Sequence, residues 1–185
     1  MSAAVETELS AVAEAEQAMS ERAAQTEEKE EEKKEEKTGA EGERLICFVC
    51  TGNTCRSPMA AAVLNARRGE DRSIRAVSRG LAPVPGAPIS DGARQALLDA
   101  GIESTEDNPW QQHRAEQIDE EMMRRADLIV GISSTHALAL ISAFPIYAEK
   151  ITSMPRDIAD PYGGDDETYR SCLAAISDGI GELFP

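Results

Sequence analysis

Two residues that could do chemistry, Cys50 and Arg56, lie at the two ends of a short segment that reads Cys-Thr-Gly-Asn-Thr-Cys-Arg. Five residues separate the thiol from the guanidinium, which is enough backbone to curve N–H groups around one tetrahedral anion. Gly52 allows a tight turn, and a helix that begins at Ser57 would direct its positive end toward the centre. The spacing therefore predicts a loop that binds a phosphoryl group.

The same positive field favours the thiolate of Cys50, which is the reactive form of a cysteine. Arg56 adds a planar group that can contact two phosphoryl oxygens at once. A thiolate at the bottom of an anion site is suited to attack on phosphorus, so we predict Cys50 as the nucleophile.

A second candidate group is Asp160, in the sequence Asp-Pro-Tyr before the last predicted helix. Phosphoryl transfer needs a proton donor for the leaving group, and a carboxyl group on a separate loop can supply it. Pro161 restricts the backbone beside Asp160 and helps to fix where the carboxyl group points. We predict Asp160 as the general acid.

Short apolar runs alternate with helical patterns along residues 44–185, and they must position these groups. Strands are predicted at Leu45–Val49, Ile74–Ser78, Asp127–Ile132 and Ile146–Ile151. Helices are predicted from Ser57, as a capping residue, to Arg68, and at Gly92–Ala100, Asp119–Arg125, Ser133–Ala143 and Asp166–Phe184. This alternation predicts a single α/β domain, a four-stranded parallel sheet flanked by helices on both faces. Ligands of such folds bind beyond the carboxyl ends of the strands, where the Cys50 loop lies.

The charge of the chain is concentrated in residues 1–43. The whole sequence has 34 acidic and 19 basic residues, for a net charge of −15, and the first 43 residues contribute −9 of it. This acidic, low-complexity segment is expected to be a disordered or helical tail, solvated or docked as a helix on a partner. It has no apolar run long enough for a secretory or membrane-spanning segment, so we expect a cytoplasmic protein without membrane contact. The acidic balance also argues against nucleic acid as a partner.

Four cysteines occur, at positions 47, 50, 55 and 172. A disulfide framework is not expected in a reducing compartment. Cys47 and Cys50 form a CxxC pair, but no second pair of ligands follows, so no structural zinc or other metal is predicted. Cys47, Cys172 and His136 are interpreted as structural residues.

The segment VCTGNTCRSPMA together with the downstream DPYGG resembles the low-molecular-weight protein tyrosine phosphatase family, over about residues 45–184. The resemblance implies a phosphatase domain at residues 44–185, without metal or cofactor, in which Cys50, Arg56 and Asp160 are the catalytic residues. The implied substrate-binding residues are Thr51, Gly52, Asn53, Thr54, Cys55, Ser57 and Tyr162. Trp110 is a second candidate for the wall of the substrate cleft.

Further roles are implied position by position. Asn53 resembles the residue that holds the loop in shape, and Ser57 the hydroxyl that bonds the thiolate. His113 resembles a residue that supports the loop. Arg79 replaces a small residue and Glu116 stands where a basic residue is common, which is a departure from the pattern. Cys55 resembles a neighbouring thiol that can pair reversibly with an oxidised Cys50.

Thr54 indicates the protein-arginine phosphatase branch, because tyrosine-specific members usually carry Ile or Leu there. We therefore expect a monomeric enzyme that hydrolyses phosphoarginine in proteins and releases inorganic phosphate. A tyrosine phosphatase of the same fold is the first alternative. A silent phosphate-binding module and an arsenate reductase rank lower, the latter because Cys172 is the one thiol left for a disulfide relay.

Overall fold

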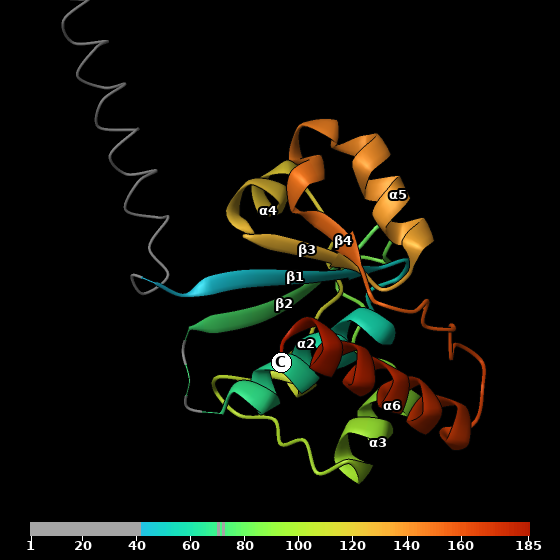
Figure 1. Cartoon of the computed structure of the whole chain (residues 1–185). Coiled ribbons are helices and arrows are strands. Elements are labelled where there is room, and N and C mark those ends of the chain that lie inside the picture. The colour runs from blue at the N-terminus through green and yellow to red at the C-terminus, as the bar shows by residue number, and fades with distance from the viewer. Residues whose placement is uncertain (1–41, 70, 72) are drawn as a thin grey trace, which may run out of the picture. The chain divides into compact units, whose positions relative to one another are not determined.

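Four parallel strands form the centre of the structure, a computed structural model that describes residues 42–69, 71 and 73–185. They are β1 (Arg44–Cys50), β2 (Ile74–Gly80), β3 (Leu128–Gly131) and β4 (Ile151–Ser153), in the order β2-β1-β3-β4 (Figure 1). Every pairing is parallel, with Phe48 opposite Ser78 on one side and opposite Val130 on the other. The predicted four-stranded parallel sheet is confirmed. The predicted tail lies outside the described residues, except for residues 42 and 43.

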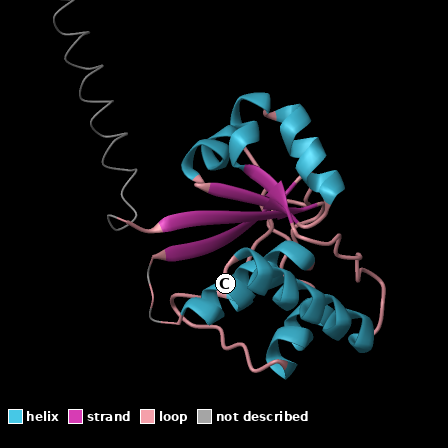
Figure 2. Ribbon diagram, viewed as in Figure 1, coloured by secondary structure: helices cyan, strands magenta, loops and turns pink. Residues whose placement is uncertain are grey.

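Helices cover both faces of this sheet, as expected (Figure 2). On one face lie α2 (Arg56–Arg68), α3 (Asp91–Asp99) and α6 (Asp166–Leu183) (Figure 1). On the other face lie α4 (Glu120–Arg125) and α5 (Ser134–Ala143). The chain also forms two short 3-10 helices, η1 (Trp110–Gln112) and η2 (Pro145–Lys150). Within the described part of the chain, no helix is long and apolar enough to cross a membrane.

Strand β1 is buried on both sides because its residues alternate between two hydrophobic clusters. Ile46 and Phe48 pack in the cluster that includes α2 and α6, whereas Cys47 and Val49 pack in the cluster that includes α4. All four are fully buried. A parallel strand covered on both faces reads as a continuous apolar run, which is why it could be recognised in the sequence. Its carboxyl end delivers Cys50 to the edge of the sheet.

The fourth strand is present, but its predicted bounds, Ile146–Ile151, are wrong. Residues Pro145–Lys150 form η2, and the strand begins only at Ile151. Pro145 lies at the first position of this 3-10 helix, where its missing N–H costs nothing. Ile146 is 75% exposed, so its apolar character does not report a buried strand.

The start of α2 also differs from the prediction that Ser57 caps it. The helix begins at Arg56, its N-cap is Cys55, and no side chain caps it with a hydrogen bond. In the first turn Pro58 has no N–H and the Met59 N–H donates to the carbonyl of Cys55, so the N–H groups of Arg56 and Ser57 have no capping side chain as a partner.

Candidate active site

The loop of residues 51–55 connects the end of β1 to the start of α2 and is fixed by its own backbone. The N–H of Leu81 donates to the carbonyl of Cys50 at 2.9 Å, and that of Ala82 to the carbonyl of Thr51 at 3.0 Å. On the α3 side, the N–H of Ser90 donates to the carbonyl of Thr54 at 2.9 Å. Because these carbonyls are engaged, the loop is held in a fixed curve at the carboxyl edge of the sheet.

Asn53 is the internal support of this curve. It has φ 54°, in the left-handed region that asparagine tolerates, and its side chain is fully buried. Its Nδ2 donates to Ser57 Oγ and to Ser78 Oγ, both at 2.9 Å, and its Oδ1 accepts from the N–H of Glu116 at 2.9 Å. Its carbonyl oxygen lies 2.7 Å from His113 Nε2. The side chain of Asn53 thus holds the loop in its curve from the buried side.

Cys50 and Ser57 meet at the bottom of the loop. The Cys50 Sγ lies 3.0 Å from the Ser57 Oγ, and both residues are buried. Ser57 also donates to the carbonyl of Arg79 at 3.2 Å. The Cys50 thiol therefore lies beside a hydroxyl and the amino end of α2.

Arg56 and Asp160 are brought together from distant parts of the sequence. Arg56 Nη2 donates to Asp160 Oδ2 at 2.6 Å, and Arg56 Nη1 donates to the carbonyl of Ile158 at 3.4 Å. The Arg56 Nε–H is buried and makes no hydrogen bond within the described residues, which leaves a donor for a phosphoryl oxygen. The carboxyl group of Asp160 is half-exposed, at 52%, and accepts from the N–H of Tyr162 at 3.2 Å.

The segment that carries Asp160 is anchored on α5 by Asp157. The N–H of Ser134 donates to Asp157 Oδ1 at 2.7 Å, and the Ser134 hydroxyl donates to Asp157 Oδ2 at 3.0 Å. These bonds, the backbone bond first, hold the pKa of Asp157 below its ordinary value. The first turn of α5 therefore helps to place the acid.

His136, also in the first turn of α5, contacts the phosphate-binding loop. Its Nε2 lies 3.0 Å from Thr51 Oγ1, and its Nδ1 lies 2.7 Å from Ser133 Oγ. Burial, and then the nearby Arg56, lower the pKa of His136. We expected a structural histidine, and this contact has no local signal in the sequence because 85 positions separate His136 from Thr51.

Thr54 and Cys55 lie on the side of the loop toward α3 and α6. The Cys55 side chain is buried, and its Sγ lies 3.2 Å from Ser90 Oγ and 3.6 Å from Tyr169 Oη. Its backbone N–H is the group left to contact a substrate. Thr54 is half-buried, and its Oγ1 lies 3.6 Å from Cys55 Sγ.

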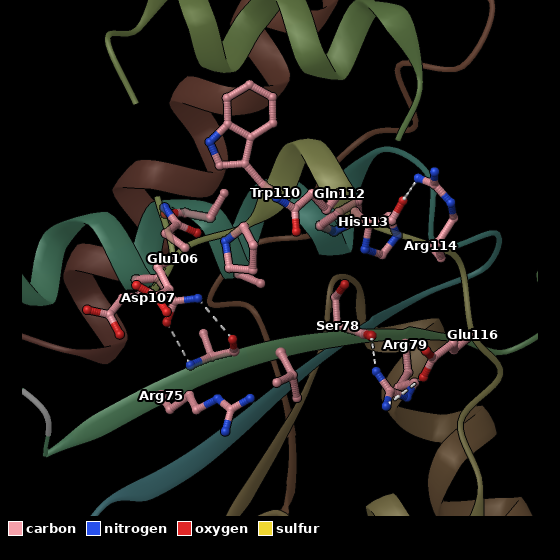
Figure 3. A pocket seen from close by; sticks show the side chains of 18 of the residues that line it. Arg75, Ser78, Arg79, Glu106, Asp107, Trp110, Gln112, His113, Arg114 and Glu116 are labelled. Atoms are coloured by element: carbon pink, nitrogen blue, oxygen red, sulfur yellow. Dashed lines mark hydrogen bonds and ion pairs between the residues drawn. The ribbon is translucent and has the colours of Figure 1, made fainter. Parts of the chain in front are cut away.

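The two departures from the family pattern compensate each other. Arg79 Nη2 and Glu116 Oε2 form an ion pair at 2.7 Å (Figure 3). Both residues also contact the loop through their backbones, Arg79 through its carbonyl to Ser57 and Glu116 through its N–H to Asn53. Burial lowers the pKa of His113, the other support on this side. The acidic residue at position 116 thus forms an ion pair with Arg79 beside the loop.

The two aromatic candidates for the cleft wall differ in exposure. Tyr162 is 78% exposed and lies two residues after Asp160, so it is free to contact a substrate. Trp110 is buried and lines another cavity, of about 580 Å³, along β2 together with Ser78 and His113 (Figure 3). That cavity lies beside the residues that support the loop, and Trp110 belongs to it.

Cys47 and Cys172 are buried, as expected for structural residues. Burial raises the pKa of each to about 12, so neither is a nucleophile at neutral pH. Cys172 nevertheless lies near Asp160, since its Sγ contacts the carbonyl of the preceding residue, Ala159, at 3.7 Å. Among the described residues, no cluster of His, Cys, Asp or Glu is arranged to hold a metal ion.

Known proteins resemble this chain in sequence and in fold. Residues 45–185 match the model of the family described as low molecular weight phosphotyrosine protein phosphatase. The chain is 35% identical over 145 residues to the protein-arginine-phosphatase of Geobacillus stearothermophilus, covering 75% of this chain and 92% of the relative.

Two solved structures show the same fold. The YwlE arginine phosphatase from G. stearothermophilus superposes with a TM-score of 0.68 at 33% identity, covering 76% of this chain and 90% of that one. A low molecular weight protein tyrosine phosphatase from T. tengcongensis superposes with a TM-score of 0.69 at 34% identity, covering 76% and 97%. The resemblance expected from the loop and the Asp-Pro segment is confirmed: the chain belongs to the low molecular weight phosphotyrosine protein phosphatase family.

Proposed function

We propose that the chain hydrolyses phosphoarginine in proteins through a phosphorylated Cys50 intermediate. The observation that carries this proposal is the meeting of three predicted groups at one edge of the sheet. Cys50 lies 3.0 Å from Ser57 at the bottom of the loop, and Arg56 at its rim lies 2.6 Å from Asp160. A nucleophile, an anion-binding group and an acid are the parts that phosphoryl transfer requires.

The first step is an in-line displacement at phosphorus. The Cys50 thiolate forms an S–P bond while the P–N bond to the arginine side chain breaks. Loop N–H groups and Arg56 bind the equatorial oxygens, and Asp160 gives its proton to the departing nitrogen. The phosphoryl dianion competes with Asp160 for Arg56, which releases the carboxyl group from its ion pair.

The second step returns the enzyme to its starting state. Asp160, now ionised, takes a proton from water as the water oxygen attacks phosphorus, and the S–P bond breaks. Inorganic phosphate leaves, and Cys50 is again a thiolate. A Cys50→Ser variant should have no measurable turnover, and a near-normal rate in this variant would contradict the scheme.

The preference for phosphoarginine is supported by Thr54 and by the arginine phosphatase among the relatives. A half-buried threonine places a small side chain at the rim, where a longer aliphatic residue would pack against an aromatic ring. One such contact typically changes discrimination by about 1–3 kcal/mol. The test is to measure kcat/KM on phosphoarginine and phosphotyrosine peptides of the same sequence. Wild type should favour phosphoarginine, and Thr54→Ile should shift the ratio toward phosphotyrosine.

A protein-tyrosine phosphatase is the second candidate, because a tyrosine phosphatase structure superposes equally well. Preference for the phosphotyrosine peptide in wild type would select it. An arsenate reductase is disfavoured because burial raises the pKa of Cys172, the thiol required for a relay, to about 12. Activity on neither peptide would indicate a phosphate-binding module.

We propose residues 44–185 as the catalytic domain and residues 1–43 as an accessory acidic segment. The domain is proposed to act as a monomer on phosphorylated proteins, without nucleic acid or membrane as a partner. The four free cysteines suit a reducing compartment such as the cytoplasm.

A further inference from the structure

The side of the loop that faces α5 carries polar side chains that the two displacement steps do not use. Thr51 Oγ1 lies 3.0 Å from His136 Nε2, and Nδ1 of the same ring lies 2.7 Å from Ser133 Oγ. His136 is 5% exposed, whereas Thr51 is exposed. A buried ring therefore holds an exposed hydroxyl at the rim of the phosphate-binding loop.

We propose that Thr51 is a specificity-determining residue for phosphoarginine and that His136 is the positioning residue that orients its hydroxyl. This inference rests on the proposed function and extends it to the leaving group. The leaving group of phosphoarginine carries several N–H donors, whereas that of phosphotyrosine is an apolar ring with no N–H. An acceptor fixed at the rim therefore favours the phosphoarginine side chain.

The hydrogen-bond chain determines what Thr51 presents to a substrate. With the ring proton on Nδ1, His136 donates to Ser133 Oγ, and Nε2 accepts the hydroxyl proton of Thr51. The Ser133 hydroxyl can then donate a hydrogen bond to Thr135 Oγ1, at 2.7 Å. Each group in the chain is then satisfied, and the Thr51 oxygen turns its lone pairs toward the substrate.

This arrangement needs the neutral form of His136, since an imidazolium has two donors and no acceptor. Burial and Arg56 on α2 lower the pKa of His136, and Asp160 and Asp157 of the acid segment oppose them. The charged groups that face the ring are thus of both signs, and burial decides in favour of the neutral ring. Protonation would make Thr51 accept from Nε2–H, which leaves its oxygen one lone pair for the substrate in place of two.

The contact is independent of the one proposed for Thr54. Thr54 lies on the α3 side of the loop, where its carbonyl accepts from the N–H of Ser90 at 2.9 Å. Thr51 lies on the α5 side. Two hydroxyls of the same loop therefore act on different sides of the substrate, and their variants should have separable effects.

The test compares kcat/KM on phosphoarginine and phosphotyrosine peptides of the same sequence. Thr51→Val, which removes the hydroxyl at constant shape, should lower the ratio of the two values by about two- to tenfold. His136→Leu should lower it by a similar factor, and the double variant by no more than one of them, because both remove one interaction.

Conservative variants and a remote control separate specificity from structure. Thr51→Ser and His136→Gln keep hydrogen-bonding groups and should recover most of the ratio. Thr105→Val removes a hydroxyl that accepts from the N–H of Asn108 in the loop before η1, and should leave the ratio unchanged. If His136→Leu does not fold, the Thr51→Val and Thr51→Ser pair decides.

Wild type that favours phosphoarginine, combined with an unchanged ratio in Thr51→Val, would overturn this inference and leave the proposed function standing. Equal losses on both peptides would also overturn it, since they indicate a structural role. Wild type without phosphoarginine activity would overturn the proposed function itself, and this is read from the wild-type measurement alone.

Discussion

The phosphate-binding loop and the acid segment are held in place in different ways. In the loop, Asn53 is fully buried and its side chain makes three hydrogen bonds, each at 2.9 Å. In the acid segment, residues 154–164, Asp160 is half-exposed and Tyr162 is 78% exposed. This segment is anchored to α5 through Asp157, which accepts from the N–H of Ser134, and to Arg56, which donates to Ile158 and Asp160.

The difference separates two tasks. Binding a phosphoryl group needs donors fixed before the substrate arrives, since reorganisation would cost part of the binding energy. Proton transfer needs a carboxyl group that reaches both the leaving group and water, and a partly exposed segment allows this. We therefore expect changes in the loop to affect stability and catalysis together, and changes at the acid to affect catalysis alone.

The largest expected effect is that of Asp160→Asn. The amide keeps the shape of the side chain but has no proton to give, so kcat on phosphoarginine peptide should fall by about 10²–10⁴-fold. The free energy of unfolding should change by less than about 1 kcal/mol, because an ion pair with a half-exposed partner contributes little. Steady-state kinetics and urea denaturation measure the two quantities.

Asp71→Asn is the matched control for Asp160→Asn. Asp71 is exposed and bonds Ser73 between α2 and β2, at the opposite edge of the sheet from the active site. It should leave kcat unchanged. A large loss of stability in Asp160→Asn would show that the acid is part of the rigid framework, and the comparison would fail.

Asn53→Ala should affect stability and activity together. It leaves the partners of the Asn53 side chain unsatisfied and places alanine at φ 54°. The free energy of unfolding should therefore fall by about 2–4 kcal/mol. Asn53→Gly adopts this φ without strain, and its smaller loss measures the hydrogen bonds alone. Stable Asn53→Ala protein with full activity would contradict the supporting role.

The ion pair of Arg79 and Glu116 should have a smaller effect. The two side chains are 23% and 58% exposed, so a double-mutant cycle with alanine should give a coupling of about 0.2–1 kcal/mol in urea denaturation. The exchanged variant Arg79→Glu, Glu116→Arg should recover much of this coupling. Coupling of zero would mean that the loop is held by the backbone contacts alone.

The smallest expected effect is that of removing residues 1–41. The phosphate-binding loop and the acid segment both lie within residues 44–185. The kcat on a small aryl phosphate should therefore remain within about twofold of that of the full chain, well under a tenfold change, which corresponds to about 1.4 kcal/mol in the activation free energy. A large loss would show that the acidic segment belongs to the catalytic unit.

Much of the active site could be predicted because its signals are local. Cys50, Arg56 and the helix start lie within a few residues of one another, and β1 is a continuous apolar run. The fourth strand could not be placed correctly, because Ile146 is apolar yet exposed and β4 pairs through only three residues. Short apolar segments have too few residues for their periodicity to separate a strand from a 3-10 turn.

Contacts between distant segments were out of reach for a different reason. The Thr51–His136 bond joins residues 85 positions apart, and the pairing of Arg79 with Glu116 looked like two separate departures. Such contacts depend on how α5 and β2 pack against the loop, and a single sequence does not encode this as a local pattern. The structure therefore adds the residues that support the loop to the candidate site predicted from the sequence.

The most direct test of the central claim is to locate the phosphoryl group during turnover. Asp160→Asn enzyme, mixed with an aryl phosphate that has a good leaving group, should be quenched with acid and analysed by peptide mass spectrometry. The Asp160→Asn enzyme should carry one phosphoryl group, on Cys50, and the matched Cys50→Ala, Asp160→Asn variant should carry none. A phosphoryl group on another residue, or turnover that persists in Cys50→Ala, would contradict it.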